Sequence, residues 1–266
     1  MDEAPLIATT GSQMNQQTIN LLQAEPQPMN PVAWSSMEAL AVEPRRMSAN
    51  RIVTIGRSDP ASLAFDMMRT KVLRSATQDK WGTLAITSPT AGCGKATIAL
   101  NLAVSLAKQD ELRVVLMDLD LRRPRIARIL GHRPEFTTQD FLTSSCRLEE
   151  FFVRIGNNLA IGASPENVAH PAELLQDTRT AWALKRLRHS LGCDIVIYNL
   201  PPMLVSDDCI GFLPNVDVVM LVIAAEATTM AEIDVCEREL TEQSKLLGVV
   251  LNKCRYKPEQ YDNYQV

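Results

Sequence analysis

The stretch Ile86-Thr-Ser-Pro-Thr-Ala-Gly-Cys-Gly94-Lys95-Ala96-Thr97 joins a short apolar run to a segment with helical spacing. A polyphosphate site needs inward-pointing backbone N–H groups, a flexible turn, a helix N-terminus and a lysine for the outer phosphates. Gly92, Gly94 and Lys95 supply these features between a strand and a helix. Alone, the Gly94-Lys95 pair is weak evidence, because an ordinary strand-to-helix turn with a solvated lysine looks the same.

Two further segments strengthen the nucleotide interpretation. Leu116-Met-Asp118-Leu-Asp120-Leu-Arg122-Arg123-Pro124 places two acids at the end of an apolar strand, where doubly wound sheets carry ligand groups. The spacing puts both acids on one side of an extended chain, where carboxylates can hold magnesium or accept a proton. The alternative is a loop pair that caps the next helix or pairs with Arg122 and Arg123. Val196-Ile-Tyr-Asn199-Leu-Pro201-Pro202 resembles a second strand end that reaches the same edge.

Hydrophobic patterning predicts the fold class. Short β-rich runs alternate with longer segments of helical spacing, and Ile98, Leu102 and Leu106 recur every four residues after the loop. This alternation predicts an α/β fold, a mostly parallel β-sheet flanked by helices on both faces. The predicted strands are Thr83–Thr87, Val114–Met117, Leu159–Ile161, Asp194–Tyr198, Val216–Ile223 and Leu247–Leu251.

Composition sets the domain boundaries. With 266 residues, 46% of them hydrophobic, the chain can bury a full core. Residues 1–57 are rich in Gln, Asn, Ser, Pro and Met without sustained periodicity, so we expect a mostly disordered leader. We expect one nucleotide-binding domain over residues 58–255. A polar, flexible tail over residues 256–266 holds three of the four tyrosines.

Charge and cysteine usage exclude several classes of protein. The net charge is −4, so there is no basic field for bulk nucleic-acid binding. The six cysteines show no metal or disulfide spacing, as in reduced cytosolic proteins. The N-terminus lacks a secretory signal, and the longest apolar stretch, Val216 to Ala225, is too short to cross a bilayer. A cytoplasmic location without a membrane span is therefore expected.

In this order and with these intervals, the three segments resemble the bacterial protein-tyrosine kinases of capsule and exopolysaccharide export. That family is a branch of the P-loop ATPases related to the partition and cell-division-site ATPases. The resemblance covers residues from about 60 to 264, and the string Asp118 to Pro124 is its most specific part. Other matching segments are Asn101-Leu102-Ala103, His170-Pro-Ala-Glu-Leu-Leu175, Val205-Ser-Asp207, Gly248-Val-Val-Leu-Asn252-Lys253 and the C-terminal tyrosines.

The resemblance implies a P-loop NTPase-like fold with ATP and Mg²⁺ as cofactors. Lys95 would neutralise the outer phosphates, while Asp118 and Asp120 would serve as magnesium ligand and acceptor of the tyrosine proton. These three residues are the catalytic candidates. Asp207 is a third candidate metal ligand, and Asn252 corresponds to the position near the nucleotide base. The loop candidates for nucleotide binding are Gly92, Cys93, Gly94, Lys95, Ala96 and Thr97.

The family transfers the γ-phosphoryl group of ATP to tyrosines of the C-terminal tail, usually on a neighbouring subunit. Tyr256, Tyr261 and Tyr264 are therefore the candidate phosphoacceptors, and solvent-exposed aromatics without such a role are the alternative. In such systems a membrane-embedded polysaccharide co-polymerase activates the kinase. The resemblance thus implies a protein that a membrane partner recruits to the inner face of the membrane.

Two positions depart from the family pattern. Ala96 stands where the family has the Ser or Thr whose hydroxyl contacts magnesium, and Thr97 points about 100° away from it. Asn199 replaces the aspartate of the third segment, which removes a negative charge that would hold the metal or its water. Both changes weaken magnesium binding, although one or two carboxylates with phosphates and water can suffice. Each lost contact costs about 3 kcal/mol, or about a hundredfold in rate.

A third departure concerns assembly. The family has a Glu, Arg, Arg pattern at three-residue spacing, in the helix before the first strand, that joins subunits into a ring. Leu63, Asp66 and Arg69 occupy those places, so only the last residue is kept. A ring of the family type is therefore not expected, and self-association of another kind is left open.

Three hypotheses follow. The first is an ATP-dependent tyrosine autokinase that regulates exopolysaccharide or capsule synthesis and export. The second is a catalytically impaired nucleotide-binding regulator in the same pathway. The third is a partition-type ATPase, which has less support because Thr90 occupies the place of the extra lysine that such proteins carry five residues before the loop lysine.

Overall fold

The inner strands are apolar throughout because both faces of the sheet are covered. The computed structural model describes residues 31–55, 59, 61–243 and 245–255. These residues form one sheet in the order β1-β4-β5-β3-β6-β2-β7-β8, in which only β4 and β5 are antiparallel neighbours. The strands are β1 (Glu38–Ala39), β2 (Thr83–Thr87), β3 (Val114–Asp118), β4 (Phe152–Ile155), β5 (Leu159–Gly162), β6 (Ile195–Asn199), β7 (Val218–Ala224) and β8 (Leu246–Asn252).

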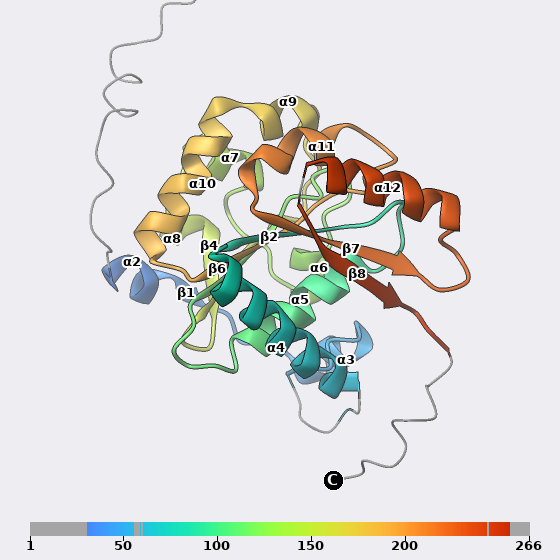
Figure 1. Ribbon diagram of the computed structural model, residues 1–266. Helices are drawn as coiled ribbons and strands as arrows, with labels where there is room; N and C mark the ends of the chain where they lie inside the picture. Colours follow the sequence, from blue (N-terminus) through green and yellow to red (C-terminus); the bar gives the residue numbers. More distant parts are fainter. Residues whose placement is uncertain (1–30, 56–58, 60, 244, 256–266) are drawn as a thin grey trace, which may run out of the picture.

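Helices cover the sheet on both faces, which confirms the predicted α/β class (Figure 1). One face carries α3 (Pro44–Ala49), α4 (Ala61–Asp79), α5 (Lys95–Leu106) and α6 (Ile126–Leu130). The other face carries α2 (Pro31–Ser36), α7 (Thr138–Leu142), α8 (Leu148–Phe151), α9 (Pro171–Gln176), α10 (Thr178–Leu191), α11 (Asp208–Phe212) and α12 (Met230–Glu242), with the short 3-10 helix η1 (Leu213–Asn215).

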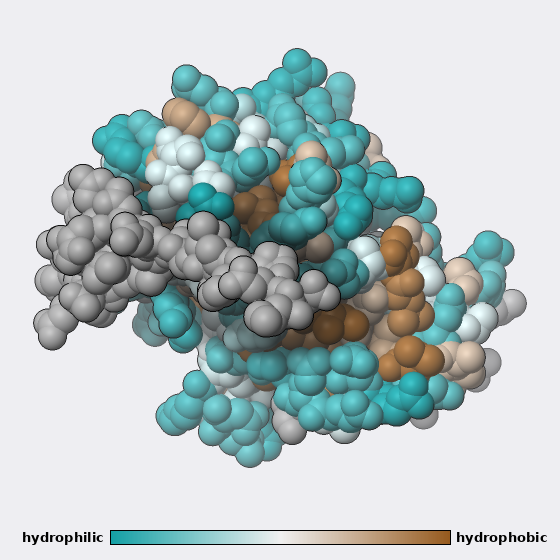
Figure 2. All heavy atoms as spheres, turned by 90° about the horizontal axis from the view of Figure 1, so that it is seen from above, coloured by the Kyte–Doolittle hydropathy of each residue, from teal (hydrophilic) through white to brown (hydrophobic). Residues whose placement is uncertain are grey.

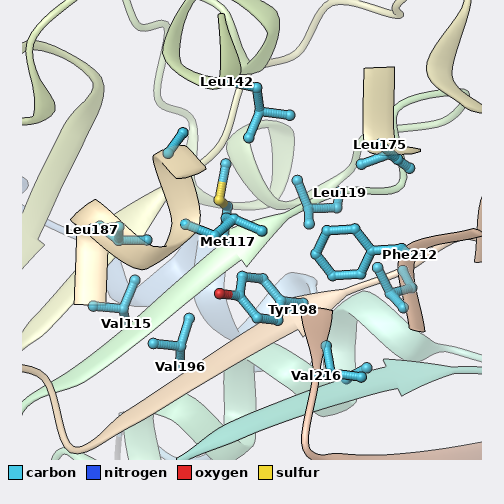
Figure 3. Close-up of a cluster of buried hydrophobic side chains, with 14 of the residues drawn as sticks. Val115, Met117, Leu119, Leu142, Leu175, Leu187, Val196, Tyr198, Phe212 and Val216 are labelled. Atoms are coloured by element: carbon cyan, nitrogen blue, oxygen red, sulfur yellow. The ribbon is translucent and has the colours of Figure 1, made fainter. Parts of the chain in front are cut away.

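Alternation along the strands separates two cores. In β3, Val115 and Met117 enter the core beneath α10, whereas Val114 and Leu116 enter the core beneath α5. Figure 3 shows the first of these cores, in which the fully buried Tyr198 of β6 lies against Phe212 of α11. Their rings meet edge to face with centroids 5.2 Å apart. This packing fixes the position of β6 and therefore of the residues that follow it.

The carboxyl ends of three strands meet at one edge of the sheet. Asp118 at the end of β3 is in register with Asn199 at the end of β6, and Asn199 is in register with Ile86 of β2. The loop after β2 therefore begins beside the acids that follow β3. This is the topological position where open α/β sheets bind ligands.

The prediction of disorder over residues 1–57 is wrong for residues 31–55, which form α2, β1, α3 and an ordered connection. Trp34 donates from Nε1 to the carbonyl of Asn157 at 2.6 Å. The fully buried Asn101 of α5 accepts from the backbone N–H groups of Val53 and Thr54, and it donates to the carbonyl of Arg51. Tertiary contacts therefore order a segment whose own periodicity is too weak to reveal it. Residues 1–30 and 56–57 lie outside the described residues.

The predicted strands agree with the structure to within two residues at each end, and the helix after the loop begins at Lys95 as expected. Two strands, β1 and β4, were not predicted. β1 has only two residues, and β4 forms an antiparallel hairpin with β5 through a turn in which Gly156 has φ of 64°. β1 is too short to show periodicity, and β4 directly follows α8 with no residue between them.

Figure 2 shows a mainly hydrophilic surface with scattered apolar areas on the face that it presents. Among the described residues, no helix combines the length and the apolar character that crossing a membrane requires.

We predict that Asn101→Ala lowers the free energy of unfolding by about 2 kcal/mol, because several buried backbone groups lose their partner. Urea denaturation would measure the loss, and hydrogen exchange should become faster in residues 51–54. Asn50→Ala is the matched control, because the side chain of Asn50 makes a single surface hydrogen bond to a described residue, the carbonyl of Arg46. Equal stability of both variants would contradict the role of Asn101 in holding this segment.

Candidate functional site

The loop between β2 and α5 has the backbone of an anion cradle. Gly92 has φ of 87° and Gly94 has φ of 96°, left-handed values that favour glycine. The hydroxyl of Ser88 donates to the carbonyl of Thr90 at 2.6 Å and closes the first turn of the loop. A Cβ atom on Gly94 would collide with the side-chain amide of Asn252. The loop therefore depends on glycine for its conformation and for space.

The loop presents hydrogen-bond donors that the protein itself does not use. Within the described residues, no backbone N–H from Ala91 to Lys95 donates to a protein acceptor. These groups lie at the N-terminus of α5, where the helix dipole is positive. Their geometry suits a bound anion such as phosphate.

Lys95 adds a full positive charge to the cradle. It is 6% exposed, and its Nζ lies 3.5 Å from Oδ2 of Asp120, with no closer carboxylate among the described residues. Oδ1 of Asp120 accepts a long hydrogen bond of 3.3 Å from the backbone N–H of Arg123. Asp120 therefore aims one oxygen toward the lysine and uses the other to hold its own loop.

Asp118 is fully buried, and four protein donors surround its carboxylate. Oδ1 accepts from the side-chain amide of Asn199 at 2.7 Å and from the backbone N–H of Asp120 at 3.3 Å. Oδ2 accepts from the backbone N–H groups of Arg125 at 3.0 Å and Ile126 at 2.9 Å. The carboxylate thus anchors the start of α6 and the loop after β3.

Burial governs the titration of both acids. It raises the pKa of Asp118 to about 6, although the hydrogen bonds from Ile126 and Asn199 favour the ionised form. Burial also raises the pKa of Asp120, and the positive charge of Lys95 opposes that shift. The ionised state of each acid therefore depends on the donors and charges around it.

Asp118 has no oxygen free for a protein-bound Mg²⁺ ion, which leaves Oδ2 of Asp120 and Oδ1 of Asn199, unpartnered within the described residues, as the remaining oxygens of these three side chains. Ala96 has no hydroxyl, Asn199 turns an N–H donor toward Asp118, and both oxygens of Asp118 are already occupied. Mg²⁺ prefers oxygen ligands in an octahedral arrangement. No group of three His, Cys, Asp or Glu side chains among the described residues could hold a metal ion.

The structure does not group Asp207 with the other two predicted metal ligands. It is exposed at the start of α11, where it lines a hollow of about 440 Å³ together with Arg122, His170 and Glu173. Asp118 and Asp120, by contrast, lie next to each other behind the loop.

The remaining candidates lie on or near the loop. Cys93 is buried, and its carbonyl accepts from Nδ2 of Asn252 at 2.8 Å, so Asn252 holds the loop from the end of β8. Ala96 is buried and Thr97 is half-buried in the first turn of α5. The predicted phosphoacceptors Tyr256, Tyr261 and Tyr264 lie outside the described residues.

The sequence did not predict one ion pair beside the site, between Arg122 and Asp208. The guanidinium of Arg122 donates to both oxygens of the fully buried Asp208, one of them at 3.0 Å from Nη2. Ser206 also donates to Asp208 at 2.9 Å. The sequence offered Arg122 in the second segment and an acidic pair at Asp207 and Asp208, but nothing local joined them.

The comparisons with known proteins agree with this geometry. Residues 84–265 match the CbiA family, described as the CobQ/CobB/MinD/ParA nucleotide binding domain. The tyrosine-protein kinase YwqD of Bacillus subtilis (strain 168) is 31% identical over 225 residues, which cover 80% of this chain and 91% of YwqD. The crystal structure of the VpsO kinase domain is 28% identical with a TM-score of 0.64, covering 73% of this chain and 96% of that domain.

Other relatives are much longer than this chain. AmsA of Erwinia amylovora is 28% identical over 213 residues, which make up 76% of this chain but 28% of AmsA. The chain therefore spans little more than a quarter of that relative's length.

We predict that Asp118→Asn lowers the free energy of unfolding by about 3 kcal/mol. An amide in either orientation turns its NH₂ group toward two N–H donors, which leaves buried groups unsatisfied. Urea denaturation of the purified variant would measure the effect. Asp207→Asn is the control, since the exposed Asp207 should change stability by less than about 0.5 kcal/mol. If the two variants are equally stable, Asp118 does not anchor the loop.

Proposed function

The chain belongs to the bacterial protein-tyrosine kinase branch of the CobQ/CobB/MinD/ParA nucleotide-binding domains, and we propose that it is an ATP-binding, kinase-like regulator of exopolysaccharide or capsule synthesis. The function that its geometry supports best is nucleotide binding with impaired phosphoryl transfer. The observation that carries this proposal is the occupied carboxylate of Asp118 beside an intact loop.

The loop supports the binding half of the proposal. The unused backbone N–H groups from Ala91 to Lys95 would surround the β- and γ-phosphates, and Lys95 would neutralise them. Asp120 keeps the ammonium of Lys95 directed into the site. Burial of Lys95 strengthens its attraction for phosphate, because the surrounding dielectric is low.

Three features support the proposal that phosphoryl transfer is impaired. Ala96 offers no hydroxyl, Asn199 offers no charge, and Asp118 has no oxygen left to accept a proton from a tyrosine. Each missing contact costs about 3 kcal/mol of transition-state stabilisation, or about a hundredfold in rate. Together such losses make turnover negligible while leaving the phosphate cradle intact.

An active tyrosine autokinase is the second candidate. The pairing of Lys95 with Asp120 and the tyrosines at positions 256, 261 and 264 favour it. In that case Asp120 would be the proton acceptor in place of Asp118, because Asp120 retains an oxygen that faces the loop.

We propose a cytoplasmic protein that works with a membrane-embedded polysaccharide co-polymerase, as the family resemblance implies. Self-association would differ from the family ring. Asp66 accepts from Arg69 at 2.8 Å and from Lys108 at 3.2 Å within the same chain. Arg69 also donates to the carbonyl of Ser105, so these charges are already engaged inside the subunit.

We predict that Lys95→Met weakens ATP binding at least thirtyfold, because a buried charge-assisted contact to phosphate contributes about 2 kcal/mol. Isothermal titration calorimetry would measure both affinities. Lys71→Met on the exposed side of α4 is the matched control and should bind ATP like the parent protein. Parent protein that binds no ATP would refute the proposed function.

We also predict that the parent protein, incubated with γ-labelled ATP, Mg²⁺ and the cytosolic segment of its activator, retains nucleotide but leaves its tail unlabelled. The double change Ala96→Ser with Asn199→Asp restores a hydroxyl and a carboxylate, so labelling should rise at least tenfold. Replacing Tyr256, Tyr261 and Tyr264 by Phe in that variant tests the acceptors. Labelling of the parent at the variant's rate would favour the autokinase instead.

A further inference from the structure

A basic hollow lies on the face of the sheet that carries α3 and α6, which pack against each other. It has a volume of about 550 Å³, within the range of small-molecule sites. Three separate segments build it, and one of them is the ordered part of the leader. Its polar lining comprises Arg46, Arg128, His132, Arg133 and Glu166.

The arginines of this hollow, which Glu166 also lines, are not held in ion pairs anywhere in the described chain. Among the described residues, none of the three forms an ion pair with a carboxylate. Within the part of the chain that the structure describes, the guanidinium of Arg46 donates only to the carbonyl of Arg128, and that of Arg128 only to the carbonyl of Pro165. Glu166 accepts from Ser164 instead of an arginine. The hollow is thus cationic in a protein whose net charge is −4.

Two observations distinguish the hollow from a surface of solvated arginines. A Cβ atom on Gly131 would lie 2.7 Å from the guanidinium carbon of Arg46. The guanidinium group can therefore pack against the end of α6 only because residue 131 has no side chain. His132 lines the same hollow, and its Nε2 is buried with no hydrogen-bond partner among the described residues. Such an atom is open to a partner from outside the chain, either a ligand or a water molecule.

We propose that this hollow binds the pyrophosphoryl group of a small molecule. Planar guanidinium groups pair with phosphate oxygens through two hydrogen bonds at once, and the imidazole of His132 can donate or accept at an ester oxygen. Three arginines match the charge of a diphosphate more closely than that of a single carboxylate.

The hollow is separate from the nucleotide loop. Asp118 binds the backbone at Arg125 and Ile126, where α6 begins, whereas Gly131 and His132 follow its other end. The proposal therefore does not depend on the proposed function, and the two sites can be tested apart from each other.

The experiment titrates inorganic pyrophosphate into full-length Lys95→Met protein, so that the loop lysine does not contribute. Calorimetry at 0.15 M salt should give a Kd below about 1 mM. Combining Lys95→Met with Arg128→Gln and Arg133→Gln should weaken binding at least tenfold. Arg74→Gln with Arg238→Gln removes the same charge elsewhere and should leave the affinity unchanged.

If the double change unfolds the protein, Arg133→Gln is titrated by itself. This change should leave the fold intact, because Arg133 makes no hydrogen bond or ion pair to any described residue. It should still weaken binding severalfold. A second titration uses a nucleoside diphosphate sugar. If this ester binds more tightly than pyrophosphate, the site is assigned to a pyrophosphate ester. If it binds more weakly, the site is assigned to the free anion. Equal affinity of the hollow variants and the control, or no binding by any of them, overturns the proposal.

Discussion

The structure depends on the hydrogen bonds that surround the buried carboxylate of Asp118. Its oxygens accept hydrogen bonds from the side-chain amide of Asn199 on the neighbouring strand, from the backbone N–H of Asp120 and from two backbone N–H groups at the start of α6. A buried carboxylate that is ionised must be compensated, and hydrogen bonds from backbone and amide donors achieve this without a counter-ion. The edge of the sheet, the loop after β3 and α6 are therefore held together at one point.

This arrangement changes the chemistry of the site. A carboxylate in place of Asn199 would repel Asp118 unless a cation lay between them, whereas the amide needs no cation. The positive charge near the loop comes from Lys95 and the N-terminus of α5. The loop thus keeps Lys95 and unused backbone N–H groups, while Asp118 has no free oxygen and Asn199 has no charge to offer a magnesium ion.

The fold was largely predictable from the sequence because its signals are local. The strands that carry the site are continuous apolar runs, and the glycines before Lys95 mark the turn into α5. The order of residues 51–54 was not predictable, since it depends on Asn101, about fifty residues away, which supplies the partners for the backbone at Val53 and Thr54. Elements as short as β1 likewise gain their stability from neighbours and not from their own pattern.

By itself the sequence determined the fold class, the loop and the set of candidate residues, because periodicity and turn chemistry act over a few residues. Only the tertiary structure decided which contacts those residues make. The hydrogen bonds from Asn199 and Arg125 to Asp118, and the meeting of Asp207 with Arg122 and His170, are contacts between residues that are not neighbours in the sequence. The same holds for the arginines that meet around Gly131, since charges from α3 and α6 become one site only when the chain folds.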